Sequence, residues 1–119
     1  MLYELRIYTV PVGRMAALQA RFRDHTCRYF ANHGFRPVGF WTNAIGGAND
    51  ELWYLLEWDD LASRERAWAR LLSDVDWLAV REASTVEGPL VLRSVNRIMR
   101  PTEFSPLGMG GVPFVSPGA

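Results

Sequence analysis

The chain contains no lysine, one cysteine and only two histidines among its 119 residues. The absence of lysine excludes Schiff-base chemistry, a lysine base and the lysine of a phosphate-binding loop. Because Cys27 stands alone, no disulfide can form within the chain, which is typical of a reducing compartment. A metal site needs three or more gathered ligands, and so few histidine and cysteine side chains predict none. We expect no organic cofactor either, because no glycine-rich dinucleotide fingerprint is present.

Net charge and long hydrophobic runs are also absent. The 13 basic residues, all arginine, balance 13 acidic ones, so nucleic acid and anionic membranes are not expected as partners. No apolar run approaches the roughly 20 residues that span a bilayer. The first predicted strand begins at residue 2, which leaves no room for a signal peptide. These features predict a cytoplasmic protein.

Hydrophobic periodicity predicts six elements in the order strand, helix, strand, strand, helix, strand. Alternation over residues 2–9, 35–42, 52–58 and 90–100 is typical of strands. Apolar residues at steps of three and four predict a helix over residues 14–33 that ends at Gly34, with Arg21 on its polar side. A second helical region follows Asp59-Asp60, restarts near Asp74 and ends at Gly88-Pro89.

This order predicts an α+β fold of the ferredoxin-like βαββαβ type. Right-handed crossovers place both helical regions on one face of the sheet. The other face, called the open face below, carries too many large side chains to remain in water. We therefore expect a second copy of the chain to cover it, as a homodimer or a higher even oligomer that forms a dimeric α+β barrel with a small cavity between the two sheets.

The expected open face follows from the alternation within each strand. On the first strand the more apolar set, Tyr3, Leu5 and Ile7, is assigned to the helices. On the third strand Leu52, Tyr54, Leu56 and Trp58 are assigned there in the same way. The open face would then carry charged and aromatic side chains together: Glu4, Arg6, Tyr8, Trp41, Trp53, Leu55, Glu57 and Arg97.

The candidate ligand-binding and proton-transfer residues lie on this expected open face. Arg6 and Arg97 could hold an anionic oxygen of a ligand whose flat body lies on Trp41 or Trp53. Glu57 and Tyr8 are the candidates for moving a proton, Glu57 because a desolvated carboxylate has a raised pKa. The alternative is purely structural, because the charges of Arg6, Glu57 and Arg97 could neutralise one another.

The remaining polar candidates have simpler interpretations. His25 lies on the apolar stripe of the first helix and could be a general base or a satisfied core or edge residue. His33 adjoins the end of that helix and is expected to contact its terminal carbonyls. Asp59-Asp60 resembles a carboxylate pair, but helix capping explains it better.

Five short segments in order resemble the NIPSNAP family: Tyr3-Glu4-Leu5-Arg6-Ile7-Tyr8-Thr9, His33-Gly34-Phe35, Val38-Gly39-Phe40-Trp41, Glu57-Trp58-Asp59 and Arg97-Ile98-Met99-Arg100-Pro101 with Phe104-Ser105-Pro106-Leu107. The resemblance covers residues 1–107 and implies a dimeric α+β barrel similar to cofactor-free antibiotic-biosynthesis monooxygenases. It implies no settled reaction. Residues 108–119 then form a tail, rich in glycine and proline, that either is flexible or crosses a neighbouring subunit.

The sequence thus predicts a protein that binds a small apolar or aromatic molecule in its barrel. As an enzyme, it would be an oxygenase, isomerase or lyase that acts through a stabilised anion without a cofactor. The alternative is a carrier, sensor or interaction module whose barrel is filled by its own side chains.

Overall fold

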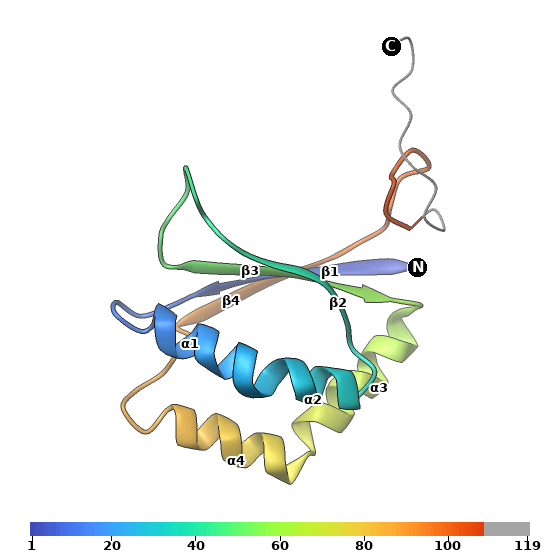
Figure 1. Ribbon diagram of the computed structural model, residues 1–119. Helices are drawn as coiled ribbons and strands as arrows, with labels where there is room; N and C mark the ends of the chain where they lie inside the picture. Colours follow the sequence, from blue (N-terminus) through green and yellow to red (C-terminus); the bar gives the residue numbers. More distant parts are fainter. Residues whose placement is uncertain (109–119) are drawn as a thin grey trace.

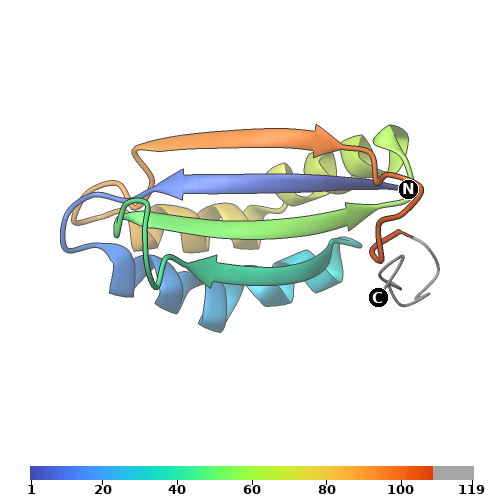
Figure 2. The same cartoon turned by 90° about the horizontal axis from the view of Figure 1, so that it is seen from above.

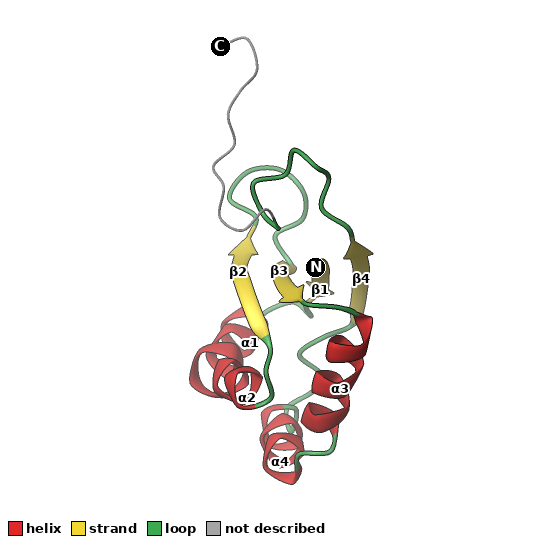
Figure 3. Ribbon diagram, turned by 90° about the vertical axis from the view of Figure 1, so that its right-hand side faces the viewer, coloured by secondary structure: helices red, strands yellow, loops and turns green. Residues whose placement is uncertain are grey.

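The four strands form one antiparallel sheet in the order β2-β3-β1-β4, in a computed structural model that describes residues 1–108 (Figure 1). Both helical regions lie on the same side of the sheet (Figure 3), which confirms the ferredoxin-like α+β fold. The elements in chain order are β1 (Leu2–Thr9), α1 (Met15–Arg21), η1 (Phe22–Thr26), α2 (Cys27–Asn32), β2 (Arg36–Thr42), β3 (Glu51–Trp58), α3 (Leu61–Leu72), α4 (Val75–Ser84) and β4 (Arg93–Met99).

The first helical region is continuous but not uniform. Between α1 and α2 lies one π-helical turn, η1, which the periodicity did not predict. Such turns are rare and are often found at functional sites. The helix ends as expected at Gly34, whose φ of +82° lies in the left-handed region that glycine adopts without strain.

The second helical region divides in two, as predicted. Asp60 caps α3 by accepting a hydrogen bond from the Ser63 amide at 2.7 Å. Asp74 caps α4 and accepts from the amides of Asp76 and Trp77. Both aspartates therefore satisfy amide groups that a helix start leaves without partners.

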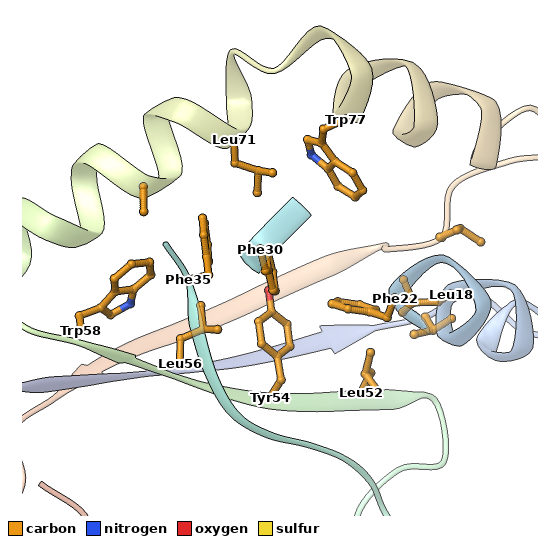
Figure 4. Packing of buried hydrophobic residues seen from close by; sticks show 13 residues of the cluster. Leu18, Phe22, Phe30, Phe35, Leu52, Tyr54, Leu56, Trp58, Leu71 and Trp77 are labelled. Atoms are coloured by element: carbon orange, nitrogen blue, oxygen red, sulfur yellow. The ribbon is translucent and has the colours of Figure 1, made fainter. Parts of the chain in front are cut away.

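The core lies between the helices and the β3 side chains assigned to them. Leu52, Tyr54, Leu56 and Trp58 are all buried there, as expected. They pack against aromatic and aliphatic side chains of the helices, including Leu18, Phe22, Phe30, Leu71 and Trp77 (Figure 4). Aromatic rings are closely packed in the centre of this core: those of Phe30 and Phe35 stack with their centroids 4.4 Å apart.

The face assignment on β1 was wrong. Directly opposed residues of antiparallel strands share a face, and β1 pairs Arg6 with the buried Tyr54 and Glu4 with the buried Leu56. Glu4, Arg6 and Tyr8 therefore face the helices, while the apolar set Tyr3, Leu5 and Ile7 lies on the open face. The assignment failed because it assumed that charged side chains avoid the core, whereas these find their partners inside it.

The open face carries no helix (Figure 2). Several large apolar side chains on it are half-buried or exposed, and the exposed fraction of Trp41 is 52%. The segment that follows β4 folds back above the start of β1, where Gly108 lies against Tyr3 (Figure 1). Apart from Gly108, the predicted tail lies outside the described residues. Within residues 1–108, no helix has the length and apolar character to cross a bilayer.

Candidate functional site

Glu4 is the centre of a hydrogen-bond network between β1 and α3. Its side chain is fully buried, yet its two carboxylate oxygens accept six hydrogen bonds. Arg64 donates two of them, at 2.9 and 3.0 Å. The other donors are Arg6 at 3.0 Å, Trp58 at 3.1 Å, and Trp68 and Asn96 at 3.2 Å.

These contacts decide the protonation of Glu4. Burial alone would raise the pKa of its carboxyl, but the hydrogen bonds from Arg64, Trp68 and Asn96 and the charge of Arg6 outweigh it. The pKa falls from the usual 4.5 to about 2. Glu4 is therefore a carboxylate at neutral pH and has no free lone pair, so it positions the two arginines and does not act as a base.

Acid should weaken the fold through Glu4. A lowered pKa stabilises the folded state above pH 4.5, and this contribution is lost as the pH falls toward 2. The loss is on the order of 3 kcal/mol. We expect the difference in free energy of unfolding between wild type and Glu4→Gln, measured by urea unfolding at pH 6, 4 and 3, to shrink with falling pH. A difference that stays constant would show that Glu4 keeps an ordinary pKa.

Arg6 connects this network to a pair of tyrosines. Its Nη1 is occupied by Glu4, its Nε donates to the Tyr54 hydroxyl at 2.7 Å, and its Nη2 donates to the Tyr8 hydroxyl at 3.3 Å. The two hydroxyls lie 2.7 Å apart. The guanidinium also lies 4.5 Å from the ring centre of Trp68, a cation–π distance. Arg6 is thus held on three sides before any ligand arrives.

The available donors and acceptors determine which tyrosine donates in the hydrogen bond between Tyr8 and Tyr54. Tyr54 is fully buried, and within residues 1–108 its hydroxyl has two hydrogen-bond partners: Arg6, which can donate but not accept, and Tyr8. Tyr54 must therefore donate its proton to Tyr8 to avoid a buried unsatisfied hydroxyl. Tyr8 then accepts from both Tyr54 and Arg6, and its own O–H remains free for a further acceptor.

Tyr8 itself lines a cavity of about 390 Å³ between the sheet and the helices. Burial and the neighbouring Tyr8 raise the pKa of Tyr54 well above its usual value, so Tyr54 stays a neutral donor. Most of the wall is aromatic or aliphatic. The lining residues are Arg6, Tyr8, Arg21, Phe22, Thr26, Phe30, Arg64, Trp68, Leu71, Leu72, Trp77 and Arg81.

This lining contains four arginines and no carboxylate, histidine or cysteine. No cluster of three potential metal ligands occurs anywhere in residues 1–108. The cavity therefore suits an organic anion with a flat apolar body, because aromatic walls bind its body and cationic or hydroxyl donors bind its oxygens.

The six predicted site residues do not form one site within a subunit. Arg6 and Tyr8 line the helix-side cavity, whereas Trp41, Trp53, Glu57 and Arg97 belong to the open face by strand register. The ion pairs also differ from the expected pairing of Glu57 with Arg6 and Arg97. Glu57 lies 3.7 Å from Arg36, and Arg6 pairs with Glu4. The structure describes one chain, so a cavity between two sheets and roles for these four residues stay predictions.

The histidines do not line this cavity. His25 lines a groove on the outside of the helices, and its Nδ1 atom is buried without a hydrogen-bond partner among the described residues. The ring of His33 lies 2.7 Å from the Asp74 carboxylate, so it contacts a side chain and not the helix carbonyls as expected.

Sequence reasoning missed Arg21, Thr26, Arg64 and Trp68. Arg21 was assigned to the solvent side of its helix but lines the cavity, where Thr26 has a buried hydroxyl without a partner. The one available signal was the alternating set Glu4, Arg6 and Tyr8, which periodicity identified but placed on the wrong face.

The comparisons with family models and with solved structures agree on one family. The NIPSNAP family model matches residues 3–106. Protein Atu4242 of Agrobacterium tumefaciens is 30% identical, with a TM-score of 0.79 over 90% of this chain and 99% of its own. A NIPSNAP-like domain protein of Burkholderia xenovorans is 26% identical, with a TM-score of 0.78 over 98% and 95%.

A more distant structure extends the fold comparison. SnoaB, a cofactor-independent oxygenase of Streptomyces nogalater, is 18% identical, with a TM-score of 0.54 over 84% of this chain and 91% of its own. At this identity the likeness concerns the fold alone. No curated protein compared with this chain gave a significant match.

Proposed function

The chain belongs to the NIPSNAP family, and from this premise we propose that it binds a small, largely aromatic molecule through an acidic oxygen in the helix-side cavity. The free hydroxyl proton of Tyr8, beside the fixed cation of Arg6, carries the proposal. The proposed ligand site therefore differs from the one that the sequence predicted. It lies between the sheet and the helices of one subunit and not between two sheets.

This pair of donors suits an oxygen on which negative charge develops. Tyr8 accepts two hydrogen bonds, which strengthens it as a donor, and Arg6 adds a permanent positive charge in a largely apolar cavity. An enolate or phenolate oxygen fits both. The reaction class is therefore oxygenation, isomerisation or bond cleavage through a stabilised anion, in which Tyr8 gives or takes the proton. The oxygenase SnoaB has a related fold, which supports only that such a fold can carry this chemistry.

A carrier or sensor is the second candidate function. It is favoured by the cavity lining, which contains no carboxylate, histidine or cysteine to act as a base. Native mass spectrometry of protein purified from its host would report a retained molecule and the subunit count together. A retained molecule that the purified protein leaves unchanged favours the carrier, and conversion of that molecule favours the enzyme.

Replacing Tyr8 by phenylalanine should weaken the binding of an acidic hydroxyl group. We expect the dissociation constant for 2-naphthol, measured by isothermal titration calorimetry at pH 7, to rise about two- to tenfold, because one hydrogen bond between neutral hydroxyls contributes about 0.5–1.5 kcal/mol. Far-UV circular dichroism would verify that the variant is folded, since Tyr54 loses its acceptor.

Tyr3→Phe is the matched control for this experiment. Tyr3 lies on the same strand but on the open face, and within residues 1–108 the one hydrogen bond of its hydroxyl is to the Met1 sulfur, at 3.6 Å. Its affinity for 2-naphthol should equal that of the wild type. If Tyr8→Phe also binds 2-naphthol as the wild type does, the hydroxyl is not the binding group and the proposed site is wrong.

We also propose that two chains pair through the open face into a homodimer. The proposal is supported by a row of apolar side chains on the two central strands and β4 that no other part of residues 1–108 fully covers: Leu5, Ile7, Trp53, Leu55, Val95 and Met99. Glu57 and Arg97 on the same face carry opposite charges, which a two-fold related copy can pair.

A further inference from the structure

Among the residues that the structure describes, Arg21 has no carboxylate partner. Arg6 and Arg64, the other half-buried arginines of the cavity, both pair with Glu4, but no acidic group of residues 1–108 lies within ion-pair distance of Arg21. Its Nη1 donates to the Ser84 hydroxyl at 3.0 Å, and its Nε atom is buried without a partner. Removing such a charge from water has a cost that an anion would offset.

The surroundings of Arg21 increase that cost. Burial lowers the pKa of its guanidinium, and the positive charge of Arg81 lowers it further. One face of the guanidinium lies 5.7 Å from the ring centre of Trp77, which leaves its edge for hydrogen bonds. Thr26, on the same wall, contributes the buried hydroxyl that lacks a partner. These groups are the donors that a carboxylate requires.

Arg21 also lies where three spaces meet, the third being a shallow one along α4 that Arg81 and Leu90 also line. It lines the inner cavity with Tyr8 and Arg6, and it lines a groove of about 610 Å³ between α1 and α4. The two helices run beside each other below the sheet (Figure 1). The groove is lined by small side chains, Ala17, Ala20, Val80 and Ala83, together with charged ones that include Asp24 and Glu87. Arg21 is the residue that the groove and the inner cavity share. The π-helical turn η1 begins at the next residue.

We propose that the ligand carries a carboxylate in addition to its acidic hydroxyl, that Arg21 is the counter-ion of this carboxylate, and that the ligand enters through the groove between α1 and α4. This inference rests on the proposed function of the inner cavity. The ligand class is then an aromatic hydroxy acid, with one oxygen at Tyr8 and Arg6 and the carboxylate at Arg21 and Thr26.

A pair of probes that differ only in charge tests the counter-ion. We expect wild-type protein to bind 6-hydroxy-2-naphthoate at least tenfold more tightly than 6-hydroxy-2-naphthamide in calorimetry. In Arg21→Gln the preference should disappear because the acid binds more weakly, while affinity for the amide changes less than twofold. The melting temperature of Arg21→Gln should not fall, because the variant removes a charge that lacks a partner.

Arg28→Gln is the matched control, since Arg28 is exposed on the same helical region, lies over Tyr29 and lines neither space. It should keep the full preference for the acid. Equal affinities of the wild type for acid and amide would overturn the counter-ion proposal and leave the hydroxyl site intact. Failure of both probes to bind at millimolar concentration would overturn the proposed function itself, and the inference with it.

The entrance has its own test. Ala83→Trp places a large ring in the groove, and Ala79→Trp places the same ring on α4 outside it. In stopped-flow measurements with 6-hydroxy-2-naphthoate, we expect Ala83→Trp to slow association and dissociation together, at least fivefold, with little change in affinity. Unchanged rates in Ala83→Trp would show that the ligand enters elsewhere.

Discussion

Replacing Glu4 by glutamine should lower the free energy of unfolding by about 3–5 kcal/mol, as is usual when one member of a buried ion pair is removed. The substitution keeps the shape of the side chain. It removes the negative charge that compensates Arg6 and Arg64, and it turns one acceptor oxygen into a donor that faces other donors. Urea unfolding at pH 7, followed by tryptophan fluorescence, measures the change.

Glu65→Gln is the matched control for this substitution. Glu65 also pairs with Arg64, at 2.7 Å, but its side chain is 70% exposed. An exposed ion pair contributes about 0–1 kcal/mol, so this variant should unfold almost as the wild type does. If Glu4→Gln were no more destabilising than Glu65→Gln, the network around Glu4 would not be a structural centre of the fold.

Introducing an arginine in place of Leu5 should convert the proposed dimer into a monomer. Leu5 is half-buried on the open face, between Leu55 and Arg97 on the neighbouring strands. In a two-fold interface the substitution occurs twice, and each new cation would be buried without a partner beside Arg97. We expect the dimer dissociation constant, measured by sedimentation velocity between 1 and 100 µM, to rise at least a hundredfold.

Val12→Arg provides the same change of charge away from the interface, because Val12 is fully exposed in the loop after β1. It should remain a dimer. Circular dichroism should show that Leu5→Arg is folded, since Leu5 lies outside the core cluster. A wild-type protein that sediments as a stable monomer at low micromolar concentration would end the dimer proposal, while the helix-side cavity, which lies within one subunit, would remain.

The sequence placed the site on the wrong face of the sheet because the more apolar side of a strand is not always the side that faces the helices. In β3, the apolar set Leu52, Tyr54, Leu56 and Trp58 identified the core face correctly, because those side chains fill the space below the helices. In β1 the same rule failed. Its apolar set faces away from the helices, and its charged set faces a core that supplies one carboxylate for two arginines.

The residues that bind Glu4, and so allow the charged side of β1 to face the core, are distant from it in the sequence. Arg64 is 60 residues from Glu4, Trp68 is 64 and Asn96 is 92. No local pattern links these positions, so their convergence could not be read from spacing. The exposure of Arg21 was misjudged for a related reason, because α4 packs beside the helix face that periodicity assigned to solvent.

The sequence by itself determined the order of the elements, the βαββαβ topology, the family resemblance, the helix start after Asp59-Asp60 and the restart near Asp74. Each of these depends on local periodicity, turn chemistry or short segments in a fixed order. The structure identified Asp60 and Asp74 as the capping residues. Only the tertiary structure decided that Glu4, Arg6 and Tyr8 face the helices, that Tyr8 keeps a free proton, and that no carboxylate within residues 1–108 pairs with Arg21. A strand's alternation separates its two faces but does not say which one is covered, because that depends on which distant side chains satisfy the charges.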